Sequence, residues 1–299
     1  MSSNKKSIYA ALFANLLIAI TKFAAGSFTR SASMISEGIH SVVDTMNQVL
    51  LLYGLKKSRK PPDATHPFGY GKELYFWSFI VSILIFSLGG GLSIYHGIHF
   101  LQDPQPQGDP TVNYIVLGAS FVFEMISFGV ALKEFRLVKG DLGWWKAFLI
   151  SKDPASFLVL FEDAAAVAGL VIVFVFMAIG HYLEMPVFDG IASIAVGVLL
   201  VAVSVVLGRE SRSLLMGEGM AHETKVKIKA LAEKDKAVLK VNNILSTYQS
   251  PQEVVLMLIV TFEPDLDTEG ITDSIGRVRT AIKQEFDLVE FVIIQPHSL

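Results

Sequence analysis

The sequence predicts an α-helical membrane protein with six transmembrane helices, followed by a small cytoplasmic α/β domain. Hydrophobic residues make up 52% of the 299 positions, and the mean hydropathy is +0.50. Such a value is high for a soluble domain of ordinary composition. The apolar residues form six stretches of about 20 residues each, the length that crosses a 30 Å hydrocarbon core. Charges collect in the loops and near the C-terminus, so the two parts of the chain have different environments.

The six apolar stretches alternate across the membrane. The first is longer than a signal-peptide core and another span follows at once, so we expect it to remain as a helix. Lysines and arginines gather at the N-terminus, in the second and fourth loops and after the sixth stretch, whereas the opposite loops hold only Arg30. The positive-inside rule therefore predicts that both termini are cytoplasmic. The stretches cover 8–28, 33–54, 74–101, 112–132, 155–180 and 188–207.

The composition changes near residue 217, which predicts a transmembrane domain over 1–216 and a C-terminal domain over 217–299. Hydrophobic periodicity there predicts an order of helix, strand, strand, helix and strand. A domain of this size has a modest core, so dimerisation would help to stabilise it. The predicted elements are a helix over 222–235, a hairpin of strands over 238–248 and 254–263, a helix over 270–286 and a strand over 289–295.

Charge and cysteine content exclude several kinds of partner and site. The formal net charge is −3, and no basic face points to a nucleic acid. The absence of cysteine removes disulfides, thiolate nucleophiles and sulfur ligands. Any bound metal must therefore be held by nitrogen and oxygen.

Ionisable residues lie inside the apolar stretches. His40 and Asp44 are four residues apart in the second stretch, so both side chains lie on one helix face. Asp44, Glu124 in the fourth stretch and Asp163 in the fifth all fall roughly 16 to 18 Å from the outer surface, at 1.5 Å of rise per residue. A central Asp costs roughly 2.5 to 3.5 kcal/mol on insertion scales, so acids at a shared depth predict a functional site. Glu162 adjoins Asp163. A divalent cation is the obvious compensating charge.

Other polar groups have ordinary structural explanations. We expect Lys22 to extend to the interface and Glu37 to be solvated near the outer surface. Asn15 fits either a hydrogen bond between helices or a group along an ion pathway. In the loop after the second stretch, Asp63 and His66 could form a weak entry site for a cation, although isolated loop residues of these types are more often only solvated.

Two motifs resemble the cation diffusion facilitator family. They are Glu37-Gly-Ile-His-Ser-Val-Val-Asp44 and the loop His66-Pro-Phe-Gly-Tyr-Gly-Lys72. With six spans and the small α/β tail, the resemblance covers nearly the whole chain. It implies a homodimeric transporter, not an enzyme, that exports divalent cations, mainly zinc, in exchange for protons. In that family, helices two and five supply a tetrahedral metal site, and His40 and Asp44 match the helix-two pair.

The fifth stretch departs from the family pattern. Four residues before Asp163 stands Val159, where the family has a His or an Asp. We expect Asp163 to be the ligand and Glu162 to be an additional ligand or a proton carrier. One nitrogen and two or three oxygens make a harder site than the usual two-histidine zinc site, so manganese and iron stand as alternatives to zinc.

The family's secondary metal sites are incomplete in this sequence. Tyr70 stands in the loop where the family usually has a His, and Asn243 and Gln295 replace common tail histidines. We therefore expect the tail to act as a dimerisation module.

The expected mechanism is alternating access. A cytoplasmic cation displaces protons from His40 and the carboxylates and leaves outward when protons return, because ligands must be deprotonated to bind metal. Asn15 and Glu124 are candidates for proton coupling or for the ion pathway. No cofactor is expected besides the transported cation. The alternatives are a membrane metal sensor or scaffold that transports nothing, and an intramembrane metallohydrolase, which the lack of His-Glu-x-x-His disfavours.

Overall fold

The computed structural model describes residues 2–104, 109–140, 143–144, 147–148 and 151–297. The chain divides into two compact units, and each is described by itself. The helical unit contains Met1–Leu55 and Phe76–Ser211, and the C-terminal unit contains Lys56–Tyr75 and Arg212–Leu299. The loop between the second and third apolar stretches therefore belongs to the C-terminal unit, although it lies far from it in sequence.

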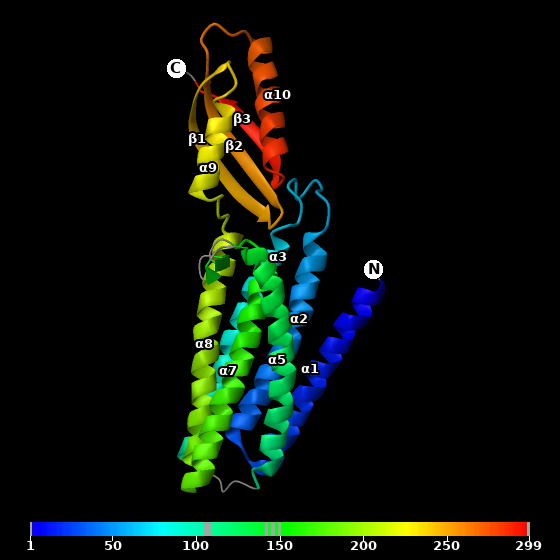
Figure 1. Cartoon of the computed structure of the whole chain (residues 1–299), viewed down its shortest axis with the longest axis vertical. Helices are drawn as coiled ribbons and strands as arrows, with labels where there is room; N and C mark the ends of the chain where they lie inside the picture. Colours follow the sequence, from blue (N-terminus) through cyan, green and yellow to red (C-terminus); the bar gives the residue numbers. More distant parts are fainter. Residues whose placement is uncertain (1, 105–108, 141–142, 145–146, 149–150, 298–299) are drawn as a thin grey trace. The chain divides into compact units, whose positions relative to one another are not determined.

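Long helices coincide with all six predicted stretches (Figure 1). The third stretch is interrupted by a π-helical segment, η1, which contains the run Gly89–Gly91. This segment joins α3 and α4 without a break in the span. The helices are α1 (Ser2–Thr29), α2 (Ala32–Ser58), α3 (Glu73–Leu84), η1 (Ile85–Gly91), α4 (Leu92–Gln102), α5 (Thr111–Lys139), α7 (Pro154–Leu183) and α8 (Val187–Leu215).

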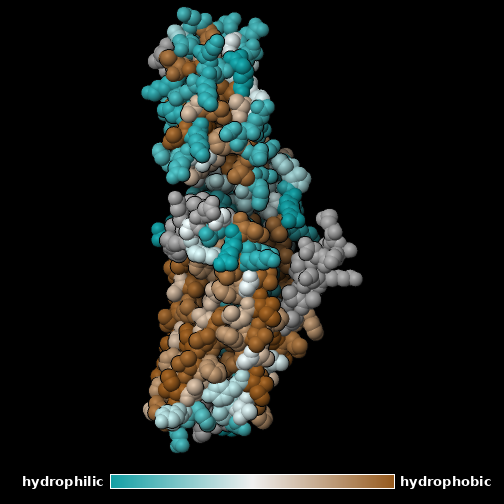
Figure 2. All heavy atoms as spheres, in the orientation of Figure 1, coloured by the Kyte–Doolittle hydropathy of each residue, from teal (hydrophilic) through white to brown (hydrophobic). Residues whose placement is uncertain are grey.

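Four spans in the described part of the chain are both long enough and apolar enough to cross a membrane: Glu73–Gln102, Thr111–Leu137, Pro154–Leu183 and Val187–Leu215. The helices α1 and α2 have 28 and 27 residues, which is also sufficient length. The composition of α2 is more polar than that of the four spans above, because α2 carries His40, Asp44 and other buried polar groups in its middle. Figure 2 shows an apolar surface along most of the helical unit.

Paired glycines bring α8 into direct backbone contact with η1 and α4. A Cβ atom added at Gly97 would lie 2.7 Å from the carbonyl oxygen of Gly190, and one at Gly197 would lie 2.8 Å from that of Gly90. Small residues permit this close approach between membrane helices. The third span and α8 thus pack backbone against backbone, with no side chain between them at these glycines.

Asp189 in the first turn of α8 holds the beginning of α2. Its carboxylate accepts hydrogen bonds from the hydroxyl of Ser31, at 2.8 Å, and from the backbone N–H of Ser33, at 3.3 Å. It also accepts from the backbone N–H of Ala32 and the hydroxyl of Ser33. The first N–H groups of a helix need such acceptors, and here another helix supplies them. The axial position of α2 is thereby tied to α8.

The C-terminal unit contains a three-stranded sheet in the order β1-β2-β3. The hairpin strands β1 and β2 are antiparallel, while β2 and β3 are parallel. Helix α9 packs against β1 and α10, and α10 packs against β3. The predicted order of elements is confirmed: α9 (His222–Ala232), β1 (Val238–Ser250), β2 (Glu253–Phe262), α10 (Thr268–Glu285) and β3 (Val289–Pro296).

The loop before α3 is packed against this sheet. A Cβ atom at Gly71 would lie 2.5 Å from the carbonyl oxygen of Gln249 at the end of β1, so a larger residue does not fit there. The ring of Phe68 meets that of Phe291 on β3 edge to face, with centroids 5.4 Å apart. These contacts explain why the loop forms part of the C-terminal unit.

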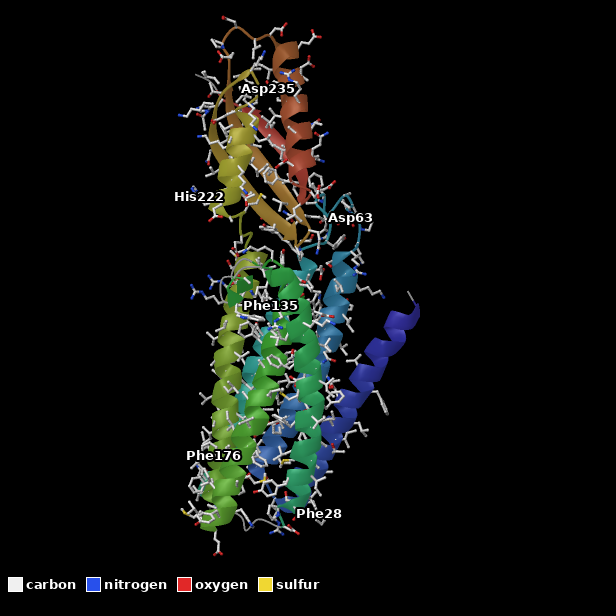
Figure 3. All side chains as sticks on the ribbon, viewed as in Figure 1. Phe28, Asp63, Phe135, Phe176, His222 and Asp235 are labelled. Atoms are coloured by element: carbon white, nitrogen blue, oxygen red, sulfur yellow. The ribbon has the colours of Figure 1, made fainter. Side chains whose placement is uncertain are left out.

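Asp235 joins the end of α9 to α10 (Figure 3). Its carboxylate receives two hydrogen bonds from the Arg277 guanidinium, at 2.7 and 3.0 Å. The hydroxyl of Ser274 and the N–H of Ala237 also donate to it, each at 3.0 Å. Bidentate pairing of this kind is stronger than an ordinary surface ion pair. Because Arg277 favours the ionised form, the pKa of Asp235 falls to about 2.

We predict that Asp235→Asn lowers the free energy of opening of α10 in the C-terminal unit at pH 6. The pKa of Asp235 is about 2 when folded and 3.8 ordinarily, so its contribution is present above pH 3.8 and is lost as the pH falls toward about 2. Hydrogen exchange of α10 amides in the purified full chain would measure this loss of stability. The exposed Asp287→Asn should change nothing, and equal protection of Asp235→Asn and wild type at pH 6 would refute the prediction.

Candidate metal centre

One face of α2 carries His40, Asp44 and Asn47, all of which are buried in the helical unit. The spacing of four and three residues places them in a row. The Nδ1 atom of His40 lies 3.3 Å from Oδ1 of Asp44. The contact lacks the geometry of a hydrogen bond, so both ring nitrogens of His40 and Oδ1 of Asp44 have no hydrogen-bond partner among the described residues.

Helix α7 presents Glu162 to this row. The side-chain amide of Asn47 donates to Oε1 of Glu162 at 2.9 Å, and the Glu162 carboxyl group neighbours that of Asp44, with which it interacts electrostatically. The structure therefore joins α2 to α7 through Glu162.

Asp163 faces a different neighbour. Its Oδ2 atom accepts a hydrogen bond from the hydroxyl of Ser127 on α5, at 2.9 Å. Consecutive residues on a helix point about 100° apart, which is why Glu162 and Asp163 meet different helices. The two acids of α7 are both buried, but Glu162 is the one that contacts Asp44.

The described residues contain no group of three or more His, Asp or Glu side chains close enough to hold a metal ion as they stand. The chemistry of the unpartnered atoms nevertheless fits a cation. His40 offers a ring nitrogen, and Asp44 and Asn47 each offer a side-chain oxygen without a hydrogen-bond partner among the described residues. Buried atoms of this kind are rare unless something binds them. Asn47 was not among the residues predicted from sequence, although its position seven residues after His40 places it on the same face.

The predicted pathway residues Asn15 and Glu124 lie beside Asp44. Together with Ile18 and Ser41 they line one small cavity. Glu124 also interacts electrostatically with Glu162 and Asp163. The acids that the sequence places at one depth on three different helices are thus neighbours in the structure.

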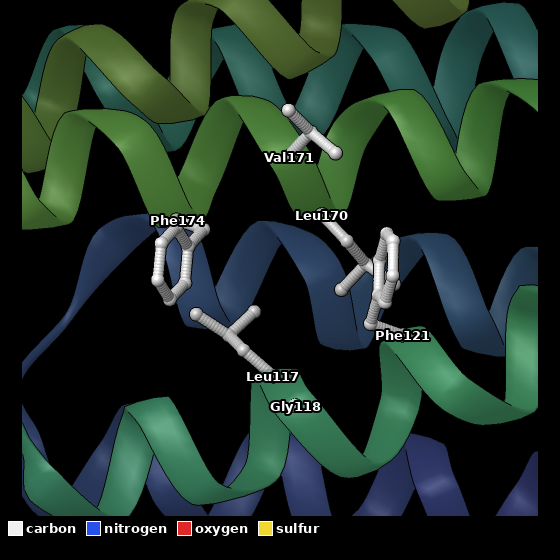
Figure 4. Close-up of a pocket in the computed structure, with 6 residues that line it drawn as sticks. All are labelled: Leu117, Gly118, Phe121, Leu170, Val171 and Phe174. Atoms are coloured by element: carbon white, nitrogen blue, oxygen red, sulfur yellow. The ribbon is translucent and has the colours of Figure 1, made fainter.

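A larger pocket of about 280 Å³ between α5 and α7 does not suit a cation. Its lining is apolar throughout, as Figure 4 shows. A dehydrated divalent ion needs oxygen or nitrogen ligands, and this pocket offers none. It is lined by Leu117, Gly118, Phe121, Leu170, Val171 and Phe174.

Two expectations about the outer half of α1 and α2 are wrong. Lys22 does not extend to the interface, and Glu37 is not solvated: both side chains are completely buried. The Nζ atom of Lys22 lies 2.9 Å from Oε2 of Glu37 and donates to the Ser41 hydroxyl at 2.9 Å. The two charges neutralise each other, so burial in the bundle replaces exposure at the membrane surface. Removing one partner of such a pair typically costs roughly 3 to 5 kcal/mol.

The loop residues Asp63 and His66 form a hydrogen-bonded turn. Oδ1 of Asp63 accepts from the backbone N–H groups of Thr65, at 2.9 Å, and His66, at 2.8 Å. Oδ2 accepts from the hydroxyl of Tyr70 at 2.7 Å. These donors, Tyr70 first, hold the pKa of Asp63 well below its usual range. Both oxygens are therefore already occupied, and the ring of His66 lies 3.6 Å from Oδ1.

The fold and the buried site define an integral membrane protein with interacting ionisable groups among its spans, a combination found along ion pathways. Residues 8–216 match the cation efflux transmembrane domain. The chain belongs to this family, the cation diffusion facilitators, whose members are transporters rather than enzymes.

Relatives from animals, plants and bacteria share nearly the whole chain. It is 35% identical to the proton-coupled zinc antiporter SLC30A9, mitochondrial, of Xenopus laevis, over 97% of this chain and 50% of that protein. It is 33% identical to metal tolerance protein C4 of Arabidopsis thaliana, over 89% and 58%. It is 27% identical to the manganese efflux system protein MneP of Bacillus subtilis, over 97% and 95%. The chain thus spans about half the length of SLC30A9.

The contacts of α7 predict which acid matters more for metal binding. We expect Glu162→Gln to weaken zinc binding at least about tenfold, because Glu162 is the α7 carboxylate that touches the α2 row. Asp163→Asn, the matched control one residue away, should have a smaller effect. Isothermal titration of zinc into the purified variants measures both. A larger loss for Asp163→Asn would contradict the assignment and restore the ligand predicted from the family pattern.

Proposed function

We propose that this chain exports divalent cations across a membrane in exchange for protons, with zinc as the favoured cargo. The observation that carries the proposal is the contact between α2 and α7, where buried His40 and Asp44 have unpartnered atoms beside Glu162. A helix-borne site in the middle of the spans is accessible from either side if the helices tilt.

Proton exchange follows from the ligand chemistry. Two neighbouring carboxylates buried in a bundle of apolar helices repel each other, so we infer that Asp44 and Glu162 hold at least one proton between them when no metal is bound. A dication needs deprotonated carboxylates and a neutral imidazole. Binding of the cation therefore displaces protons, and their return favours its release. Glu124 and Asn15, which line the cavity beside Asp44, give protons a route to the site.

The choice of zinc rests on His40, an imidazole ligand that suits zinc. The names of relatives support both zinc and manganese, since SLC30A9 is a zinc antiporter and MneP is a manganese efflux protein. Carboxylate and amide oxygens around Asp44 make the site harder than one with two imidazoles, so manganese and iron stand as alternative cargoes.

The proposed orientation places both termini in the cytoplasm, as the distribution of basic residues indicates. The C-terminal unit then acts as the dimerisation module of a homodimer. In the helical unit, the α4–α8 pair with its paired glycines serves as the scaffold, and α2 and α7 change their approach to each other during alternating access.

The proposal predicts the behaviour of the purified protein in proteoliposomes. Zinc added on one side should drive protons to the other, and His40→Ala or Asp44→Ala should reduce this flux at least about tenfold, because each removes a ligand whose protons exchange with metal. The matched control Asp103→Asn, at an exposed position after α4, should leave the flux unchanged. A pH-sensitive dye inside the vesicles and a zinc indicator measure both fluxes.

One result would refute transport, and a second would refute the proposed site. If wild type bound zinc but moved neither zinc nor protons, the chain would be a sensor or scaffold. If Asp44→Ala transported as fast as wild type, the site would lie elsewhere. Manganese and iron tested in the same vesicles identify the preferred cargo.

A further inference from the structure

The buried pair Lys22–Glu37 lies on the route between the metal centre and the α1–α2 turn. Glu37 precedes Asp44 by seven residues on α2, and Gly169 follows Glu162 by seven on α7. A Cβ atom at Gly169 would lie 3.0 Å from Oε1 of Glu37, so these two positions meet. At 1.5 Å of rise per residue, this second level lies roughly 10 Å from the level of Asp44 and Glu162.

Only one of the two carboxylate oxygens of Glu37 has a partner among the described residues. Its Oε2 atom is paired with Lys22 at 2.9 Å, but Oε1 has no hydrogen-bond partner among the described residues although the side chain is completely buried. This oxygen points into the interface between α2 and α7, on the same side as the site. A buried carboxylate with one unpartnered oxygen is poised to accept a second cation contact.

Lys22 also acts on the metal centre by its charge. It interacts electrostatically with His40, Asp44 and Glu124. In the part of the chain that the structure describes, it is the only Lys or Arg whose side chain is fully buried. A dication held at His40 and Asp44 would repel this ammonium group, because like charges in a medium of low dielectric interact strongly. Arrival of the cation therefore weakens the Lys22–Glu37 pair.

We propose that Lys22 and Glu37 form the exit gate of the cation pathway, with Glu37 as a transient ligand for the leaving divalent cation. In this structure the ion pair joins α1 to α2 and holds the unpartnered oxygen of Glu37 against Gly169 of α7. When a cation occupies the metal centre, Lys22 withdraws from Glu37, and the carboxylate receives the cation on its way toward the α1–α2 turn. The inference rests on the proposed transport function.

A charge swap distinguishes a gate from a structural ion pair. The double variant Lys22→Glu/Glu37→Lys keeps an ion pair between α1 and α2, but places a lysine on α2 three residues from His40. A structural role predicts that both stability and transport return. The gate predicts that thermal stability recovers relative to Glu37→Lys alone, while zinc flux in proteoliposomes stays below about one fifth of wild type, since the α2 carboxylate is lost.

Zinc affinity gives a readout independent of transport. Lys22→Met removes a positive charge near the centre and should tighten zinc binding several-fold, whereas Glu37→Gln leaves Lys22 unpaired and should weaken it. A pair that only holds α1 to α2, without acting on the metal centre by its charge, predicts no such opposite change. The swap Lys229→Glu/Glu233→Lys, at the exposed pair on α9, is the matched control and should alter neither affinity nor flux.

The outcomes are separable. If the charge swap transports zinc at one fifth of the wild-type rate or more, or if both single variants shift zinc affinity in the same direction, the gate is refuted. If the swap does not fold, the neutral double variant Lys22→Met/Glu37→Gln decides by the same flux threshold. If the wild type shows no zinc flux, the proposed transport function is refuted instead. The affinity test then decides whether Lys22 and Glu37 act on the metal centre.

Discussion

The constraint on which this structure depends is the placement of carboxyl groups inside a bundle of apolar helices. Asp44, Glu124, Glu162 and Asp163 come from three helices, and the bundle must neutralise or hydrogen-bond each of them. An amide donor to Glu162, a hydroxyl donor to Asp163 and the nearby charge of buried Lys22 do part of this in the structure. These compensations are incomplete, and the atoms that remain unpartnered are those that a cation would use.

Around that site, the fold separates rigid from adjustable contacts. Backbone contact at paired glycines fixes α8 to the third span, and Asp189 anchors the start of α2 to α8. The contacts between α2 and α7 are of another kind, because they run through ionisable side chains whose partners change with protonation or with a bound cation. Conformational change is therefore expected where the chemistry takes place, while the scaffold keeps its geometry.

Periodicity and length were sufficient to predict the six helical stretches, the order of elements in the C-terminal unit and the proximity of Asp44 to Glu124. They could not predict which helix faces meet. Lys22 was expected at the membrane interface because its partner, Glu37, lies on another helix. Asn47 is identified as part of the site only by its hydrogen bond to Glu162. The acceptor for the N–H groups of α2 also comes from Asp189, more than 150 residues later. Such pairings depend on tertiary contact, which a single sequence does not reveal.

We infer that the buried carboxyl groups hold protons until a dication replaces them. Calorimetry of zinc binding in buffers of different ionisation enthalpy tests it most directly, because the difference in heat reports the protons released. We expect at least about one proton to be released for each zinc bound by the wild type, and fewer by Asp44→Asn. Zinc binding at this site without proton release, or equal release from wild type and Asp44→Asn, would contradict it.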